Sequence, residues 1–211
     1  MMHYFFDLDN TVAQSRAKLS PEMKRELSSI GSVVVISGAS QAQMEYQLDG
    51  LDCEIMSQNG NVNSVWKRFL TSKESAKILD HISWYANVLD DQLEGRGAQI
   101  SYSFVGHHAD YDKKKKYDPE GSKRRAILKE YPAPEGIEIR IGGTTCLDYL
   151  PEGLNKGYNI YKYISHKGWR RKSCIYIGDA LFPGGNDETV IGTIATYPVN
   201  GPDDTLRFLQ T

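Results

Sequence analysis

Cysteine is scarce in this chain of 211 residues, and the three that are present lie far apart. Cys53, Cys146 and Cys174 form no Cys-x-x-Cys pair, and their odd number leaves one thiol over in any disulfide pairing. Two of them fall within apolar runs typical of strands, which favours buried free thiols. We therefore expect no disulfide-stapled secreted fold, and a reducing, cytoplasmic location.

Long apolar runs and an excess of charge of one sign are also missing. No apolar stretch approaches the roughly 20 residues that span a bilayer, and acidic residues interrupt the first one too early for a secretory signal. Lys and Arg number 25 and Asp and Glu 27, so the formal net charge is −2. This balance provides no general attraction to nucleic acid or to an anionic membrane. We expect neither as a partner.

An alternation of short apolar runs and helical segments begins the chain. Residues 4–6, 33–36 and 53–56 are apolar runs of strand length, and helical segments follow the first two. Ser20 and Pro21 suit the N-cap and first helical position of one of these helices. This order is typical of a parallel sheet with right-handed crossovers. The same rhythm returns late in the chain, with a helix over 155–166 and strands over 174–177 and 193–197.

Between these two parts lies a block with a different pattern. Its apolar residues predict a helix over 74–93, a half-exposed antiparallel strand over 99–105 and a helix near 119–131. Strands over 137–141 and 144–149 flank a Gly-Gly turn, and a polar loop holds the lysines of 113–116. We therefore expect an α/β protein with a Rossmann-like parallel sheet and an inserted α+β domain. The core is predicted to comprise residues 1–71 and 151–211, and the insertion residues 72–150.

The first strand ends in two carboxylates, Asp7 and Asp9, which are separated by one residue. The carboxyl ends of parallel strands form the ligand crevice of open α/β sheets. Two adjacent carboxylates repel each other unless a cation or a shared proton offsets their charge, and Mg²⁺ prefers such oxygen ligands. A carboxylate can also be a nucleophile toward phosphorus. On these residues alone, an acidic turn after an edge strand is an equal alternative.

Further strand ends and helix starts carry groups suited to phosphoryl transfer. Ser37 and Gly38 end the second strand just before a helix, whose N-terminal amides can hold an anion. Lys156 opens the helix after the insertion and supplies a positive charge for phosphate oxygens. Asp179 follows the fourth strand and can help to hold a metal ion, while Asp9 is placed to act as general acid and base. Because these groups share one edge of the sheet, a catalytic site is favoured over a turn.

Together these motifs resemble those of the haloacid dehalogenase-like (HAD) phosphotransferases. They are Asp-Leu-Asp-Asn-Thr at 7–11, the Ser37 loop, Lys156, and Gly178-Asp179 followed by Asn186-Asp187. The insertion lies between the second and third motifs, where that family has its C2-type cap domain. The resemblance implies that Asp7 is the phosphorylated nucleophile and Asp9 the acid and base. It also implies a Mg²⁺ ion held by Asp7, the Asp9 carbonyl and Asp179, with Asp187 nearby.

Within that family the chain is most similar to the eukaryotic-type phosphomannomutases. Residues 151–158 resemble their Pro-Glu-Gly-x-x-Lys-x-Tyr motif, and residues 178–187 resemble their long fourth motif. The pair Arg96-Gly97, and Gly142-Gly143 followed by Asp148, resemble their cap. The resemblance implies that Arg96 and Asp148 face a sugar phosphate from the cap. We name Gly38, His107 and Asn186 as further candidates for substrate contact.

The cap also departs from the phosphomannomutase pattern. Those enzymes carry further arginines after the Arg-Gly pair, whereas residues 103–108 here read Ser-Phe-Val-Gly-His-His, and Cys146 replaces a serine near the sugar. Because a mutase must hold a bisphosphate at both ends, the missing arginines favour hydrolysis. The expected function is a Mg²⁺-dependent phosphatase for a small phosphorylated metabolite, such as a sugar phosphate. A phosphohexomutase and a non-catalytic phosphosugar-binding protein are the alternatives; the oligomeric state is left open.

Overall fold

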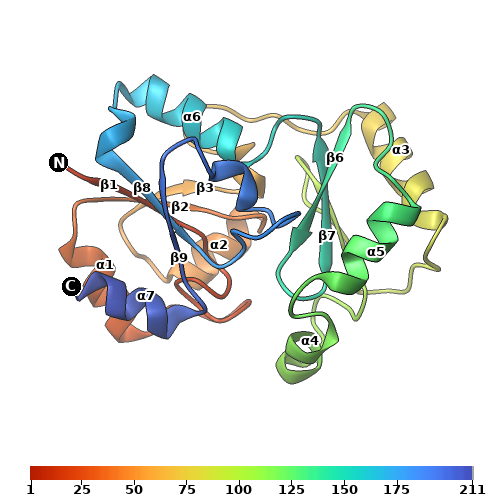
Figure 1. Ribbon diagram of the computed structural model, residues 1–211, viewed down its shortest axis with the longest axis horizontal. Helices are drawn as coiled ribbons and strands as arrows, with labels where there is room; N and C mark the ends of the chain where they lie inside the picture. Colours follow the sequence, from red (N-terminus) through yellow and green to blue (C-terminus); the bar gives the residue numbers. More distant parts are fainter. Residues whose placement is uncertain (211) are drawn as a thin grey trace.

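Two β-sheets of different kinds organise the chain in the computed structural model, which describes residues 1–210 (Figure 1). The first sheet is parallel and has the strand order β3-β2-β1-β8-β9. Its strand order reverses direction at β1, between β2 and β8, and such a switch point opens a ligand crevice at the carboxyl ends of the strands. The strands are β1 (His3–Phe6), β2 (Ser32–Ile36), β3 (Glu54–Met56), β8 (Cys174–Gly178) and β9 (Ala195–Pro198).

Helices cover both faces of this parallel sheet (Figure 1). On one face Phe5 packs against Ile160 and Tyr163 of α6, and on the other Phe6 packs in a cluster with Met23 of α1 and Met44 of α2. Alternate residues of β1 therefore lie in different apolar clusters, as a strand with two buried faces requires. The helices of this domain are α1 (Pro21–Ser29), α2 (Gln41–Leu48), α6 (Lys156–Lys167) and α7 (Pro202–Leu209).

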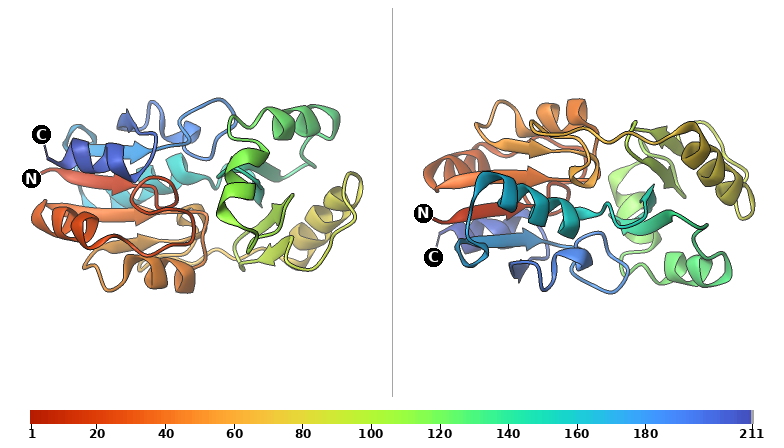
Figure 2. Two further views of the ribbon diagram at one scale, coloured as in Figure 1. Left: turned by 90° about the horizontal axis from the view of Figure 1, so that it is seen from below. Right: turned by 90° about the horizontal axis from the view of Figure 1, so that it is seen from above.

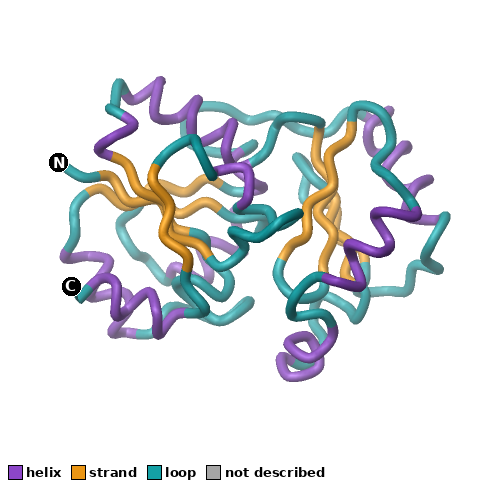
Figure 3. The backbone as a smooth tube through the Cα atoms, viewed as in Figure 1, coloured by secondary structure: helices purple, strands orange, loops and turns teal. Residues whose placement is uncertain are grey.

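The second sheet is antiparallel, has the order β4-β5-β7-β6 and lies beside the first as a separate group of strands (Figures 2 and 3). Its strands are β4 (Leu93–Gly95), β5 (Ile100–Ser103), β6 (Ile137–Gly142) and β7 (Cys146–Pro151). The helices of this part, which we call the cap, are α3 (Ser72–Ser83), α4 (Tyr111–Tyr117) and α5 (Ser122–Glu130). Ile78 and Ile82 of α3 pack against Tyr102 and Tyr149 of the sheet.

Several predicted elements of the cap differ in the structure. The helix expected over 74–93 ends at Ser83, and Leu93 begins β4, because its apolar side chain packs against the cap core as part of a strand. The lysine run is not a loop: it forms α4, which Asp110 caps by accepting hydrogen bonds from the amides of Asp112 and Lys113. Helix α7 was not predicted, although Pro202 at its first turn is a usual start signal.

The strand expected over 99–105 is antiparallel, as predicted, but it is not half-exposed. All four residues of β5 are buried. Ile100 and Tyr102 face the apolar core of the cap, whereas Ser101 lines the space between the two sheets. The polar face that alternation assigns to solvent is therefore hydrogen-bonded within the cap, through Ser101 to Asp148 and Ser103 to Thr145.

Within residues 1–210, no helix combines the length and the apolar character needed to cross a membrane.

Candidate active site

A crevice of about 760 Å³ separates the carboxyl ends of the parallel strands from the cap sheet. Both domains contribute to its walls. The predicted site residues that line it are Asp7, Asp9, Ser37, Gly38, Asp179 and Asn186 from the core, with Arg96, His107 and Asp148 from the cap. The remaining two predicted residues, Lys156 and Asp187, are fully buried, and Lys156 contacts Asp7.

Lys156 lies between two carboxylates at the base of the crevice. Its ammonium donates to Asp7 Oδ1 at 2.5 Å and to Asp187 Oδ1 at 2.7 Å. The Tyr176 hydroxyl also donates to Asp187 Oδ1, at 2.6 Å. Burial acts to lower the pKa of Lys156, but the Asp187 and Asp7 carboxylates more than offset it and hold that pKa above its usual value. Lys156 is therefore a permanent cation beside the predicted nucleophile.

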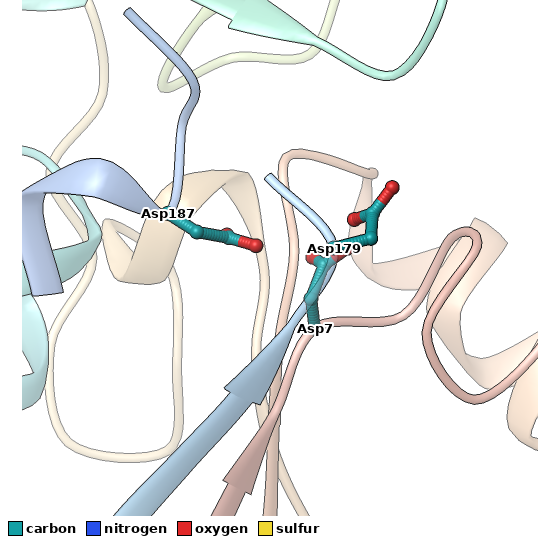
Figure 4. Close-up of side chains that lie close together, drawn as sticks. All are labelled: Asp7, Asp179 and Asp187. Carbon is teal, nitrogen blue, oxygen red and sulfur yellow. The ribbon is translucent and has the colours of Figure 1, made fainter. Parts of the chain in front are cut away.

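Three carboxylates, from Asp7, Asp179 and Asp187, lie close together, and each offers an oxygen within 4.8 Å of the others (Figure 4). Burial raises the pKa of Asp7 to about 7, with Lys156 lowering it and Asp187 raising it. Burial, and then the Asp7 and Asp187 carboxylates, raise the pKa of Asp179 well above its usual range. A divalent cation would relieve this repulsion, and an all-oxygen donor set suits Mg²⁺. The residues present therefore fit the predicted metal.

Asp9 is oriented by two donors that the sequence analysis did not identify as site residues. Its Oδ1 accepts hydrogen bonds from the Arg16 amide at 3.0 Å and from Gln47 Nε2 at 2.9 Å. Gln47 lies on α2 and is fully buried. A buried glutamine among polar helix residues gives no sequence signal, because its role depends on which strand end faces the helix.

The loop after β2 brings the core into contact with the cap. Ser37 is buried, and its hydroxyl accepts a hydrogen bond from the Ala39 amide at 3.2 Å. A Cβ atom on Gly38 would lie 2.8 Å from Asp148 Oδ2, so a larger residue there would displace the Asp148 carboxylate. The guanidinium of Arg96 donates to the Gly38 carbonyl at 2.7 Å.

Cap residue Glu94 pairs with two of the arginines that reach the crevice. It accepts from Arg96 at 2.6 Å and from Arg16 of the core at 2.5 Å. Burial acts to raise the pKa of Glu94, but Arg96, then His107 and Arg16, lower it to about 2. His107 is buried, with Nε2 3.1 Å from the Ser101 carbonyl and Nδ1 3.3 Å from the Arg16 guanidinium.

Two lysines of α4 line the same crevice. Lys114 is buried and donates to the His107 carbonyl at 3.0 Å, whereas Lys115 is exposed. A polar loop, as the sequence predicts for the lysines of 113–116, would point all four side chains to water, but a helix presents them on different faces.

Sequence comparison relates the chain to sugar-phosphate enzymes. The model of the family described as eukaryotic phosphomannomutase matches residues 92–211. Phosphomannomutase 1 of Dictyostelium discoideum is 27% identical, over 97% of this chain and 94% of that protein. The phosphomannomutase of Saccharomyces cerevisiae is 25% identical, over 97% of this chain and 91% of that protein.

Solved structures share the fold at lower sequence identity. A haloacid dehalogenase-like hydrolase of Bacillus subtilis superposes with a TM-score of 0.73 at 12% identity, covering 100% of this chain and 99% of that one. The C-terminal domain of trehalose-6-phosphate phosphatase from Candida albicans has a TM-score of 0.67 at 18% identity, covering 98% and 90%. The predicted HAD fold, with a parallel-sheet core and an α+β cap, is confirmed.

Proposed function

The chain belongs to the eukaryotic phosphomannomutase family, and we propose that it acts as a Mg²⁺-dependent phosphatase on a small sugar phosphate. The observation that carries this proposal is the arrangement of Asp7, whose carboxylate faces the crevice on one side and contacts Lys156 on the other. Asp9 lies in the same crevice, held by Gln47. These are the groups needed to transfer a phosphoryl group first to a carboxylate and then to water.

The proposed reaction has two steps at the same phosphorus atom. An oxygen of Asp7 attacks the phosphorus while the bond to the sugar oxygen breaks, and Asp9 delivers a proton to that leaving oxygen. Asp9 then takes a proton from a water molecule, which attacks the aspartyl-phosphate and releases inorganic phosphate. Lys156 stays charged throughout and stabilises the anionic oxygens of Asp7.

Asp7, Asp179 and Asp187 are the side chains that would hold Mg²⁺. When bound, the ion supplies positive charge that lowers the repulsion between the carboxylates and an approaching phosphate dianion. Oxygen from the Asp9 carbonyl is the further donor that the family resemblance implies.

Charge in the cap favours hydrolysis over return of the phosphoryl group to a sugar. A mutase must hold a second phosphate far from the nucleophile, ideally with the paired donors of arginine. Here the donors of Arg96 are taken up by Glu94 and Gly38, and Arg16 is paired with Glu94. The other cations that the cap contributes to the crevice wall are Lys114 and Lys115, which are point charges without a bidentate fork.

A panel of sugar phosphates incubated with Mg²⁺ tests the proposal. We expect release of inorganic phosphate, with a burst of free sugar that matches one phosphoenzyme per chain. Asp7→Asn is expected to abolish both the burst and turnover, because the amide cannot accept the phosphoryl group. Asp80→Asn, an exposed change on α3, is the matched control. Full turnover by the Asp7→Asn variant would exclude Asp7 as the nucleophile.

A phosphohexomutase is the second candidate, because the chain belongs to a mutase family and Lys114, Lys115 and Arg16 all line the crevice. Mannose 1-phosphate with a catalytic amount of a hexose bisphosphate separates the two functions. Formation of the 6-phosphate isomer identifies a mutase, whereas free mannose and phosphate identify a phosphatase. Tight sugar-phosphate binding with neither product would indicate a binding protein.

A further inference from the structure

The loop that carries the fourth motif lies against the cap as well as the core. This loop, residues 179–187, follows β8 and reaches β6 of the cap (Figure 1). The Ile141 amide donates to the Gly184 carbonyl at 2.9 Å, and the Asn186 amide donates to the Ile141 carbonyl at 3.2 Å. The loop therefore extends the edge of the cap sheet by one parallel bridge.

Packing inside the loop makes it a single folded unit. Phe182 is half-buried against the apolar core of the cap. A Cβ atom on Gly185 would lie 2.2 Å from the Ala180 carbonyl oxygen, so the turn is tighter than any other residue allows. We therefore expect a displacement at β6 to move the loop, including Asn186 and Asp187.

Arg140 of β6 joins the cap to the core beside this loop. Its Nε donates to Glu138 Oε1 on the same strand at 2.5 Å, and its Nη1 donates to Glu188 Oε2 of the core at 3.0 Å. The same Glu188 oxygen accepts the Gly184 amide at 3.0 Å. Glu188 directly follows Asp187, which binds Lys156 and Tyr176.

Glu138 extends the same cluster to the third motif. Its carboxylate accepts the Asn155 side-chain amide at 3.0 and 3.1 Å and the Gly153 amide at 3.0 Å. Asn155 is the N-cap of α6, where its Oδ1 accepts the Tyr158 amide at 3.1 Å. Lys156 is the next residue. The Arg140 guanidinium thus lies between two carboxylates. Glu138 holds Asn155, which precedes Lys156, and Glu188 holds the loop that carries Asp187.

We propose that Arg140 is a positioning residue that couples docking of the cap to the placement of Asp187 and Lys156. Without its charge, Glu138 and Glu188 would face each other across the domain boundary unpaired, and the loop would lose one of its attachments to β6. The effect on overall stability is expected to be small, because Arg140 is partly exposed and such ion pairs contribute little. The inference rests on the proposed function in one respect: it takes Asp7, Asp179 and Asp187 as a metal site.

Binding of Mn²⁺, followed by electron paramagnetic resonance without substrate, tests the coupling. Loss of a supporting residue behind metal ligands commonly weakens metal affinity by about tenfold or more, and we expect about tenfold for Arg140→Gln. Glu188→Gln is expected to have the same effect, and Arg140→Lys to restore part of the affinity. Arg125→Gln, an exposed change on α5, is the matched control and should bind Mn²⁺ as the unaltered protein does.

Amide hydrogen exchange of residues 180–188 in the metal-free protein provides a second measurement. We expect faster exchange in Arg140→Gln and unchanged exchange in Arg125→Gln. If exchange of this loop is the same in Arg140→Gln as in the unaltered protein, the positioning role is wrong. If the unaltered protein binds no Mn²⁺, the proposed metal site is wrong, and the exchange measurement still decides the role of Arg140.

Discussion

Lys156 is fully buried, and its ammonium is the charge that keeps Asp7 and Asp187 side by side. Removing one partner of a buried ion pair leaves an uncompensated charge and commonly costs about 3–5 kcal/mol. We therefore expect Lys156→Met to lower the free energy of unfolding by about that amount and to abolish turnover. Urea denaturation with and without Mg²⁺ measures the first effect.

The control for this substitution is Lys172→Met, which removes an exposed lysine near the start of β8. It should leave the unfolding free energy within about 0.5 kcal/mol of the unaltered protein, as surface changes usually do. Equal stability of the two variants would show that Lys156 does not compensate the carboxylates.

Gln47 tests how strongly catalysis depends on the orientation of Asp9. Gln47→Leu keeps a side chain of similar size but removes the donor to Asp9 Oδ1 and to the Ala17 carbonyl. Since general acid–base catalysis contributes about 10²- to 10⁴-fold to a rate, loss of orientation is expected to lower kcat by about tenfold with little change in KM. Steady-state kinetics of Gln47→Leu are compared with those of Gln41→Leu, a change at an exposed position of α2. An unchanged kcat would mean that the Arg16 amide alone orients Asp9.

At the scale of the element, strand β4 meets the loop after β1 through Glu94. The folded pKa of Glu94, about 2, lies below the ordinary value of about 4.3. A carboxylate whose pKa is depressed on folding contributes stability that is full above the unfolded pKa and is lost as the pH falls through the folded pKa.

Glu94→Gln should therefore lower the unfolding free energy by about 1 kcal/mol at pH 7, after allowance for solvent screening. The difference from the unaltered protein should shrink as the pH falls from about 4.5 toward about 2. Denaturation across this range measures the difference, with the exposed Glu120→Gln as control. A difference that stays constant with pH would contradict the ion pair with Arg16 and Arg96.

The elements that were predicted correctly are marked by local composition, whereas those that were predicted wrongly depend on tertiary packing. The central strands of the parallel sheet, β1, β2 and β8, are short apolar runs that are largely buried, and local composition reveals them. The cap helix α3 ends at Ser83 although apolar residues continue at helical spacing to Leu93. Only the packing of Leu93 against the cap sheet separates a strand from a longer helix there.

At the scale of the whole molecule, metal binding should stabilise the folded chain. A ligand that binds only the native state adds about 2.7 kcal/mol at a concentration 100 times its Kd. We expect the Tm in 10 mM Mg²⁺, a concentration chosen for the assay, to exceed that in EDTA by several degrees. The Asp179→Asn variant should lose this shift, whereas the exposed Asp80→Asn variant should keep it. A shift that survives in Asp179→Asn would place the ion elsewhere.

The sequence by itself determined which segments form the parallel strands and which chemical groups follow them. Asp7, Asp9, Ser37 and Asp179 follow strands that local periodicity reveals, and the ends of parallel strands must share one edge of a sheet. The nature of the reacting groups followed from their side chains. Their division into nucleophile, acid–base and metal ligands remains part of the proposal.

Only the tertiary structure decided how the cap meets that edge. The pairing of Glu94 with Arg16, the support of Asp9 by Gln47 and the bridge from Arg140 to Glu188 join residues far apart in the chain. Such contacts depend on how two folded domains sit against each other, which no local pattern of residues encodes. At the crevice Glu94 pairs with Arg96 of the cap and with Arg16 of the core, and this engagement of both guanidiniums is the physical basis for proposing water as the phosphoryl acceptor.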